Sequence, residues 1–223
     1  MTQAFESIIV EPPRPATACV IWLHGLGATG HDFVDAVEAL ELPSKHSVRF
    51  IFPHAPNQAV TINNNMTMPA WFDIHGLDIN AIQDEKGITA AQATLGLLIK
   101  DVIQQGIPSD RIILIGFSQG GALALHTAIR FDQPLAGVAG LSTYIPLHRQ
   151  LAKEQNPANK NISIFLAHGF MDPVVSYWIG QQTLAFLEGA GYEPQWNTYP
   201  MAHTVCLPEL HALGQWIRGL LEI

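Results

Sequence analysis

A serine between two glycines carries the clearest chemical signal in this sequence: Ser118, in the segment Gly116-Phe117-Ser118-Gln119-Gly120. An apolar run, residues 111–117, precedes it, and an Ala- and Leu-rich helical pattern, residues 119–130, follows it. A strand, a sharp turn and a helix in this order present a serine hydroxyl above a sheet, and glycines let the neighbouring chain pass closely. The alternative is an ordinary turn in which the serine only caps a helix. We predict that Ser118 is a nucleophile that attacks an ester or thioester carbonyl.

The acid that supports this serine must follow it in the chain. A serine hydroxyl is a weak nucleophile until a base takes its proton, and in this setting the acid comes next and the histidine last. Asp132 and Asp172 are the two aspartates between Ser118 and the last histidines. Asp132 lies at the far end of the helix that starts at the serine, about 20 Å away at a rise of 1.5 Å per residue, so it is out of reach. Asp172 comes just after the apolar run 162–167 and is the predicted acid, with an Asp-Pro turn as the alternative.

The predicted base is His203, which directly follows the last strand-like run, residues 195–199. His211 competes with it, but His211 lies inside the final amphipathic pattern, where we expect it to face solvent. His168 ends a strand-like run and suits a structural hydrogen bond better. Asp172 would hold the His203 imidazole in the correct tautomer and stabilise its protonated form.

The glycine-rich segment from His24 to Gly30 predicts the remaining part of the site. It follows the apolar run 18–23, and glycines let a backbone approach a substrate closely. We expect the backbone N–H groups of Leu26 and Gln119 to form an oxyanion hole, and His24 to brace the loop. The alternative is an ordinary glycine-rich turn between a strand and a helix.

These residues need a frame that brings them to one edge, and the sequence predicts an α/β fold. Short apolar runs bounded by Gly and Pro alternate with helical patterns, which indicates a mostly parallel central sheet with helices on both faces. Ligands bind such sheets at the carboxyl ends of the strands. The predicted strands are 18–23, 48–52, 111–117, 135–141, 162–167 and 195–199, and the predicted helices are 32–40, 89–105, 119–130, 177–190 and 207–221.

One segment interrupts this alternation. Residues 54–84 are expected to be irregular, with three consecutive asparagines, two methionines and the pair Trp71-Phe72. Loops of this length are uncommon in compact domains and often form lids or binding loops. We therefore expect the segment to lie over the active site, the alternative being a surface excursion packed by its own aromatic side chains. The rest of the chain, residues 1–223, is expected to form a single domain.

The composition excludes several classes of partner. The formal net charge is −8 and the eleven Lys and Arg residues are scattered, so binding to nucleic acid is not expected. Two cysteines make no disulfide framework, the N-terminus has no signal-peptide pattern, and no apolar run approaches the length of a membrane span. We expect a cytoplasmic protein without a transmembrane segment. No histidine spacing indicates a metal site, and the chemistry needs no cofactor.

The motifs together resemble the acyl-protein thioesterase and lysophospholipase-like carboxylesterases, which are small α/β-hydrolases. The matching segments run across almost the whole chain in the family's order. The family often has Gly before the histidine and Ser after it, where this sequence has Ala202 and Thr204. The matches are HGLGATG at 24–30, PHAP at 53–56, AWFDI at 70–74, DEKGI at 84–88, GFSQGGALAL at 116–125, LSTYIPL at 141–147, HGFMDPVV at 168–175 and Met-Ala-His at 201–203.

The resemblance implies an α/β-hydrolase fold, a triad of Ser118, Asp172 and His203, and an oxyanion hole at Leu26 and Gln119. It also implies that Trp71 and its surrounding loop line an apolar acyl groove. Our further candidates for substrate contacts are Phe72, Met66, Tyr144 and Val174. A homodimer is implied by analogy alone, since the apolar loop around Trp71 and Phe72 suits a partner chain as well as a substrate.

Three functions remain open from the sequence. The first is a carboxylesterase or thioesterase that acts on medium or long acyl chains through an acyl-enzyme. The second is a hydrolase of another bond on the same fold, such as a lysophospholipase, a small-ester hydrolase or a peptidase, because a fold does not fix a substrate. The third is a binding module without catalysis, which the presence of every triad member disfavours.

Overall fold

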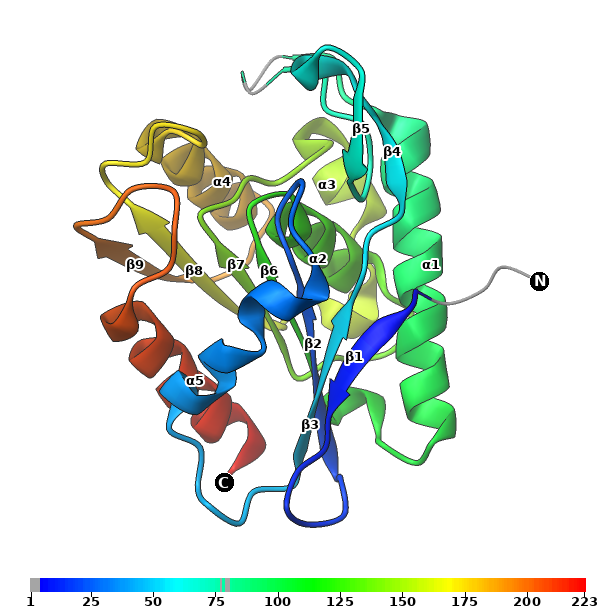
Figure 1. Ribbon diagram of the computed structural model, residues 1–223, viewed down its shortest axis with the longest axis vertical. Coiled ribbons are helices and arrows are strands. Elements are labelled where there is room, and N and C mark those ends of the chain that lie inside the picture. Colours follow the sequence, from blue (N-terminus) through cyan, green and yellow to red (C-terminus); the bar gives the residue numbers. More distant parts are fainter. Residues whose placement is uncertain (1–4, 77, 79–80) are drawn as a thin grey trace.

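A seven-stranded sheet forms the centre of the molecule (Figure 1). The computed structural model describes residues 5–76, 78 and 81–223. The strand order is β1-β3-β2-β6-β7-β8-β9, and every neighbouring pair is parallel except β1 with β3. The fold is an α/β-hydrolase fold, as predicted. The strands are β1 (Ser7–Val10), β2 (Ala18–Leu23), β3 (Val48–Pro53), β6 (Ile112–Phe117), β7 (Gly137–Leu141), β8 (Ser163–Gly169) and β9 (Gln195–Tyr199).

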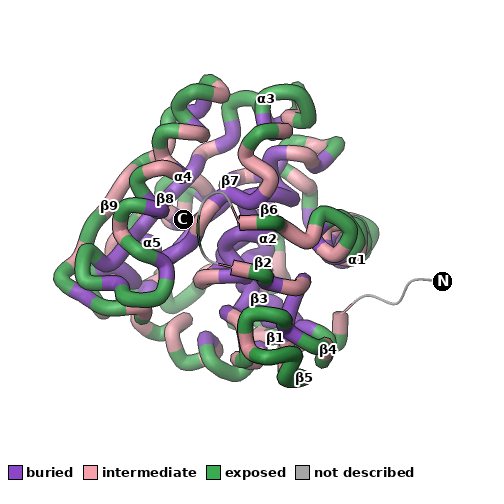
Figure 2. Tube along the Cα trace, turned by 90° about the horizontal axis from the view of Figure 1, so that it is seen from above, coloured by how far each residue is buried: buried purple, intermediate pink, exposed green. Residues whose placement is uncertain are grey.

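Alternating side chains of the central strands pack into two hydrophobic cores, one on each face of the sheet. Every residue of β2 is buried, with Ile21 facing one core and Val20 the other. A continuous apolar run is the pattern expected of a strand covered on both faces. Figure 2 shows these buried central strands inside a shell of more exposed helices.

The helices divide between these two faces. Side chains of α1 (Glu85–Gln104), α2 (Gln119–Arg130) and α4 (Tyr177–Gly189) join the core that contains Ile21. Side chains of α5 (Leu207–Leu221) join the core that contains Val20. The predicted bounds of α2 and α5 are confirmed, and α4 ends one residue before its predicted end. α1 begins four residues earlier than predicted, because the side chain of Asp84 caps it by accepting a hydrogen bond from the N–H of Gly87.

The segment 54–84 is more regular than we predicted. It contains the antiparallel strands β4 (Asn57–Val60) and β5 (Met66–Pro69), joined through a 3₁₀ turn at Thr61–Asn63 and two asparagines with positive φ. Asparagine tolerates this left-handed conformation, so the run of three asparagines makes a hairpin connection. The hairpin stands beyond the end of β3 (Figure 1). Residues 77, 79 and 80 of the predicted loop lie outside the described residues.

The remaining differences from the sequence predictions are short elements. The predicted helix 32–40 is two successive 3₁₀ turns, Gly30–Phe33 and Asp35–Leu40, the first closed by a capping box between Thr29 and Asp32. Strand β1 and the single-turn helix α3 (Leu151–Glu154) were not predicted. Both are four residues long, which is too short for a periodic pattern to stand out.

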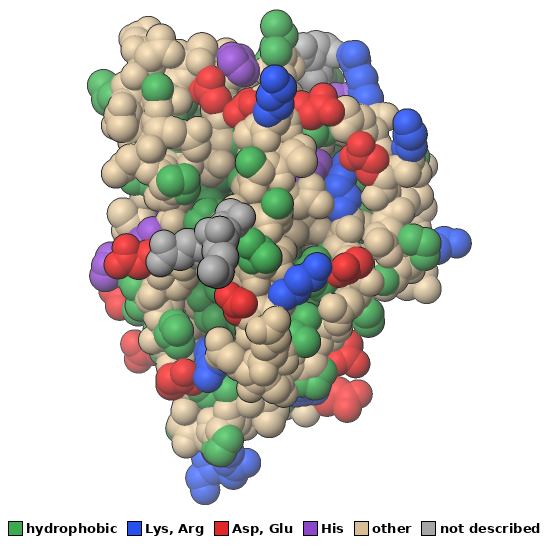
Figure 3. Space-filling model, turned by 90° about the vertical axis from the view of Figure 1, so that its right-hand side faces the viewer, with side chains coloured by type: hydrophobic (Ala, Val, Ile, Leu, Met, Phe, Trp, Pro, Cys, Tyr) green, Lys and Arg blue, Asp and Glu red, His purple; other side chains and the backbone are tan. Residues whose placement is uncertain are grey.

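The cysteines, the surface charges and the helix lengths can be compared with what the composition predicted. Both cysteines are free thiols. On the face shown in Figure 3, Lys and Arg side chains are scattered among Asp and Glu. Within the described part of the chain, no helix is both long and apolar enough to cross a membrane.

Candidate active site

Ser118 lies on a strained turn between β6 and α2. Its backbone has φ +53° and ψ −121°, a conformation that side-chain-bearing residues rarely adopt. Two hydrogen bonds hold it there: its N–H donates to the carbonyl of Leu141 at 2.9 Å, and the hydroxyl of Thr143 donates to its carbonyl at 2.6 Å. Gly116 and Gly120 approach each other so closely that a Cβ on Gly116 would overlap the Gly120 backbone.

His203 lies between the serine and the aspartate. Its Nε2 is 2.9 Å from Ser118 Oγ, and its Nδ1 is 2.7 Å from Asp172 Oδ2. The other carboxylate oxygen of Asp172 accepts hydrogen bonds from the backbone N–H groups of Val174, at 2.8 Å, and Val175, at 3.0 Å. The carboxylate is therefore fully buried and held by three hydrogen bonds, with one oxygen aimed at the imidazole. The structure thus brings together the three residues that the chain order selected.

The competing residues lie elsewhere. His211 is 3.6 Å from Glu41 on the surface of α5, and Asp132 is 3.5 Å from Lys100 beyond the end of α2. His168 is buried behind the acid, where its Nε2 donates to the carbonyl of Val175 at 2.8 Å. Burial lowers the pKa of His168, so this imidazole is a neutral support of the turn that carries Asp172.

His24 ties together the loops beside the serine. Its Nδ1 is 2.7 Å from the carbonyl of Gly25 and its Nε2 accepts from the N–H of Ala55 at 3.0 Å, a pattern that fixes one neutral tautomer. Burial lowers the pKa of this histidine in agreement with that tautomer. The indole N–H of Trp71 donates to the carbonyl of His24 at 2.8 Å. His24 thus stabilises its own loop, as we expected, and also holds Trp71 in the segment after the hairpin.

The backbone N–H groups of Leu26 and Gln119, both beside Ser118, have no acceptor within the described residues. On either side of the site, Gly27 donates to Pro69 and Ser118 donates to Leu141. The Gln119 side chain is held by both of its polar atoms, because Oε1 accepts from the N–H of Trp71 at 3.0 Å and Nε2 donates to the carbonyl of Phe72 at 2.7 Å. Unpaired donors at the start of a helix suit a developing negative charge.

A cavity of about 510 Å³ opens beside Ser118 and His203. Its walls are mostly apolar and come from the loops after β2, β6, β8 and β9 and from the hairpin. Val174 lies in this wall, as predicted for a substrate contact. The lining residues are Gly25, Leu26, Ala28, Asp32, Phe33, Ile62, Asn63, Ile74, Phe117, Ser118, Val174, Val175, His203, Thr204 and Val205.

The other predicted groove residues lie outside this wall. Trp71 and Phe72 are 3% and 2% exposed, because both are packed into the core between the sheet and α1. They are therefore not available to a partner chain, which removes the reason we gave for a dimer at this loop. Met66 is exposed on the hairpin, away from the cavity lining.

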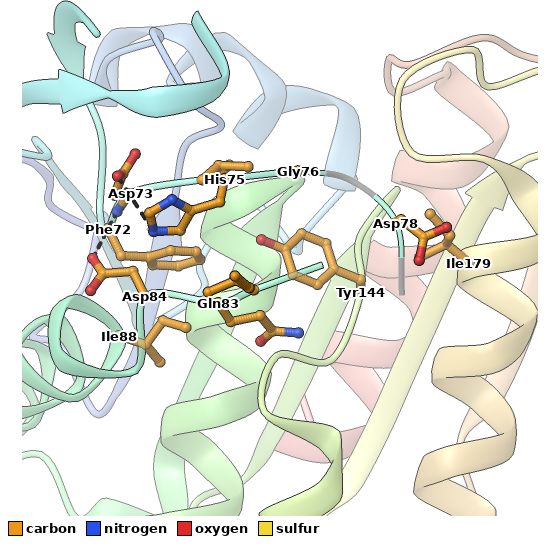
Figure 4. A pocket seen from close by; sticks show the side chains of 12 residues that line it. Phe72, Asp73, His75, Gly76, Asp78, Gln83, Asp84, Ile88, Tyr144 and Ile179 are labelled. Atoms are coloured by element: carbon orange, nitrogen blue, oxygen red, sulfur yellow. Dashed lines mark hydrogen bonds and ion pairs between the residues drawn. The ribbon is translucent and has the colours of Figure 1, made fainter. Parts of the chain in front are cut away.

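A second, narrow cavity of about 30 Å³ contains Phe72 and Tyr144, which face each other across it (Figure 4). Ile88 and Ile179 add apolar side chains from α1 and α4. Ile74 belongs to the walls of both cavities. Ile74 is thus the residue at which the cavity beside Ser118 and the narrow cavity with Tyr144 meet. Within the described residues, no group of three or more His, Cys, Asp or Glu side chains is placed to hold a metal ion.

Comparison with known proteins shows the family to which this chain belongs. Residues 5–221, nearly the whole chain, match the profile of the phospholipase/carboxylesterase family. The chain belongs to this family. It is a serine hydrolase of the α/β-hydrolase fold, as the sequence motifs indicated.

Several relatives of this phospholipase/carboxylesterase family member resemble it over nearly their whole length. Acyl-protein thioesterase 1 from Neurospora crassa is 42% identical over 210 residues, which cover 90% of this chain and 86% of the relative. Acyl-protein thioesterase 1 from Mycosarcoma maydis is 39% identical over 233 residues, which cover 97% of each chain. The crystal structure of Zea mays acyl-protein thioesterase 2 has a TM-score of 0.86 at 28% identity and covers 97% of this chain and 99% of that one.

Thr143 and Ile74 are two residues of this carboxylesterase-family site that sequence reasoning missed. Thr143 anchors the serine turn through its hydroxyl, and its signal was its place just after β7 at the carboxyl edge of the sheet. Ile74 lines both cavities, and its signal was an apolar residue two positions after the Trp71-Phe72 pair. Neither residue is of a type that chemistry alone would single out.

Proposed function

We propose that this protein hydrolyses carboxylic esters or thioesters with medium to long acyl chains through a triad of Ser118, His203 and Asp172. The observation that carries the proposal is the pair of hydrogen bonds of His203, at 2.9 Å to the serine hydroxyl and 2.7 Å to the buried carboxylate. The proposal agrees with the relatives of this chain that are named acyl-protein thioesterases.

The proposed reaction has two halves. Ser118 Oγ attacks the carbonyl carbon while His203 Nε2 accepts the hydroxyl proton, and Asp172 stabilises the imidazolium. The N–H groups of Leu26 and Gln119 donate to the tetrahedral oxyanion, each contributing about 3 kcal/mol to the transition state in comparable sites. The alcohol or thiol leaves with the proton from His203. Water then attacks the acyl-enzyme with the same base and the same donors, which releases the acid and restores the serine.

The preference for longer acyl chains rests on the shape of the site. The cavity beside Ser118 is mostly apolar, and Ile74 lies in its wall and in the wall of the narrow cavity with Phe72 and Tyr144. We propose that a long acyl chain runs from the first cavity past Ile74 toward the second. An alkyl chain that follows this path leaves water at about 0.8 kcal/mol for each methylene group. Tyr144 and Phe72 would contact the end of the chain rather than its carbonyl. We also propose a cytoplasmic location, which agrees with the two free thiols.

The first experiment tests the nucleophile. Wild type should release a burst of chromogenic alcohol from an activated ester at one equivalent per enzyme, and Ser118→Ala should lose turnover by at least about 10⁴-fold, since a triad acts as a unit. A native unfolding transition in Ser118→Ala shows that the loss is chemical. Turnover that survives the substitution would contradict the proposal.

The second experiment tests the acyl path. The ratio kcat/KM is measured for thioesters and esters of increasing acyl length, in wild type and in Ile74→Trp. We expect the ratio to rise with chain length in wild type, and the larger side chain to reduce it for long chains while sparing acetyl esters. A profile that is flat or falls with length would favour the small-ester alternative, and a preference for lysophospholipids over thioesters the lysophospholipase alternative.

A further inference from the structure

Four large apolar side chains are exposed within nine residues. The segment that carries them runs from the end of β8 to the first turn of α4 (Figure 1). Phe170 is 52% exposed, Met171 57%, Val174 45% and Trp178 53%. Single exposed apolar side chains are ordinary on protein surfaces, but a group of large ones indicates an interaction surface. We call these four side chains the 170–178 face.

The backbone under this face is fixed, so its side chains do not fold back into the core. The N–H of Phe170 donates to Tyr199 at 3.1 Å, and the N–H of Met171 donates to Met201 at 3.2 Å. The turn that follows is closed by the carboxylate of Asp172, which accepts two backbone N–H groups. The turn that aims the Asp172 carboxylate inward thus leaves the side chains around it facing solvent.

This part of the chain has almost no charge. Between Lys160 and Glu188, the one Asp, Glu, Lys or Arg is Asp172, and its carboxylate is buried against His203. The neighbouring loop, between Glu193 and Glu209, has no Asp, Glu, Lys or Arg at all. These two stretches therefore offer no Lys or Arg side chain to an anionic lipid or to an acidic peptide, and the net charge of −8 opposes both.

The face adjoins the cavity beside the serine. Val174 is a member of the face and also lines that cavity, together with Val175. Asp172, in the same turn, is hydrogen-bonded to His203. Whatever covers the face therefore lies at the opening through which a substrate reaches Ser118.

We propose that the 170–178 face docks the protein on a neutral or zwitterionic lipid surface, with Phe170, Met171 and Trp178 inserted among the lipid chains. An uncharged group of large exposed side chains suits a fluid apolar interface. Recognition of a protein partner commonly adds charged groups at the rim, and the one charged side chain of this segment, Asp172, is buried. The inference goes beyond the proposed function, because it concerns binding and holds without turnover.

The test measures binding to phosphatidylcholine vesicles with the Ser118→Ala protein, so that catalysis plays no part. We expect the protein to sediment with the vesicles and its tryptophan emission to shift to the blue. Trp178 is the reporter, since Trp22 and Trp71 are buried and Trp196 and Trp216 are partly buried. The shift should disappear in Trp178→Phe, while that protein still sediments with the vesicles.

The decisive variant combines Phe170→Gln, Met171→Gln and Trp178→Gln. We expect its partition coefficient to fall by about tenfold or more, since burial of one large apolar side chain alone contributes roughly that factor. Its hydrolysis of a water-soluble acetate ester should stay near wild type, because none of the three side chains lines the cavity. The matched control combines Ile9→Gln and Leu97→Gln, two exposed apolar side chains on β1 and α1, and it should bind like wild type.

Four results would overturn the proposal. They are no binding of wild type, equal binding of the triple variant, binding that requires phosphatidylglycerol in the vesicles, and a lipid-free dimer that the triple variant abolishes. The last result would assign the face to a second copy of the chain. If the triple variant fails to fold, Trp178→Gln alone replaces it, with an expected loss of a few-fold in the same sedimentation assay.

Discussion

At the scale of single residues, the site depends on backbone geometry as much as on reactive side chains. Ser118 has a positive φ, which costs about 1–3 kcal/mol for a residue other than glycine. Hydrogen bonds from its N–H to Leu141 and to its carbonyl from Thr143 hold this conformation. Asp172 is held in the same way by the N–H groups of Val174 and Val175. The reactive atoms are thus oriented by residues that take no part in the chemistry.

Asp172→Asn tests this orientation. The new amide can still accept from Val174 and Val175, but its NH₂ group would face His203 Nδ1 and force the imidazole to carry its proton on Nε2. That tautomer cannot accept the proton of Ser118, so kcat should fall by about 10⁴-fold with little loss of stability. Steady-state kinetics and urea unfolding measure the two effects. A loss of less than tenfold would remove Asp172 from the proposed triad.

The buried carboxyl of Glu209 should make the free energy of unfolding depend on pH. Its side chain is fully buried in the first turn of α5, where one oxygen accepts from the N–H of Cys206 at 3.3 Å and the other has no partner within the described residues. Burial raises the pKa of this carboxyl from 4.5 to about 8. Between these two values the folded protein binds a proton that the unfolded chain releases. The stabilisation from Glu209 is therefore complete below pH 4.5 and is lost as the pH rises toward about 8.

Glu209→Gln should remove this dependence, because the amide stays neutral and still suits the capping position. At about 1.4 kcal/mol per pKa unit, the stability that wild type loses across this pH range, relative to Glu209→Gln, amounts to a few kcal/mol. Urea unfolding from pH 5 to pH 9 measures it. Parallel stability curves for the two proteins would show that Glu209 does not titrate in this range.

At the scale of elements, the turn at Ser118 is also a packing contact between α2 and the end of β2. A Cβ on Gly120 would lie 2.5 Å from the carbonyl oxygens of both Leu23 and His24. The first turn of α2 can therefore approach β2 only because residue 120 is glycine. This contact brings the serine turn beside the loop that begins at His24.

Two glycine-to-alanine variants distinguish the effect of this close packing on stability from the effect of helix propensity. Gly120→Ala should destabilise the protein by about 2 kcal/mol or more and reduce activity, because the overlap is with backbone atoms that cannot yield easily. Gly96→Ala, in the interior of α1 with open space around its Cβ position, should stabilise it by about 1 kcal/mol. Urea unfolding measures both free energies. Similar effects at the two positions would show that close packing at Gly120 is unimportant.

At the scale of the whole molecule, the central sheet separates two hydrophobic cores, and residues of its inner strands are protected from solvent. Cys19 is fully buried on β2, in the middle of the sheet, and burial raises the pKa of its thiol to about 12. Cys206 is partly exposed at the start of α5. The two thiols therefore report on different events, local access at Cys206 and opening of the sheet at Cys19.

Thiol labelling makes this difference measurable. A disulfide reagent should modify one thiol in the native protein, at Cys206, and two in urea. Cys19 should react only as fast as the whole protein unfolds, with the rate changing in step with urea unfolding. Cys206→Ser should remove the native reaction completely. Rapid native labelling of Cys19 would mean that the sheet opens locally around β2.

The sequence by itself determined the alternation of the main strands and helices, the bounds of α2 and α5, and the three residues that meet at Ser118. The strands and helices follow from local physics, because apolar runs and helix periods involve neighbouring residues, and the three residues follow from the chain order of serine, acid and base. Only the tertiary structure decided which residues line the cavities, because Trp71 is a core residue while Ile74 lines both cavities. Burial depends on which distant segments pack together, and that information is absent from any single stretch of the chain.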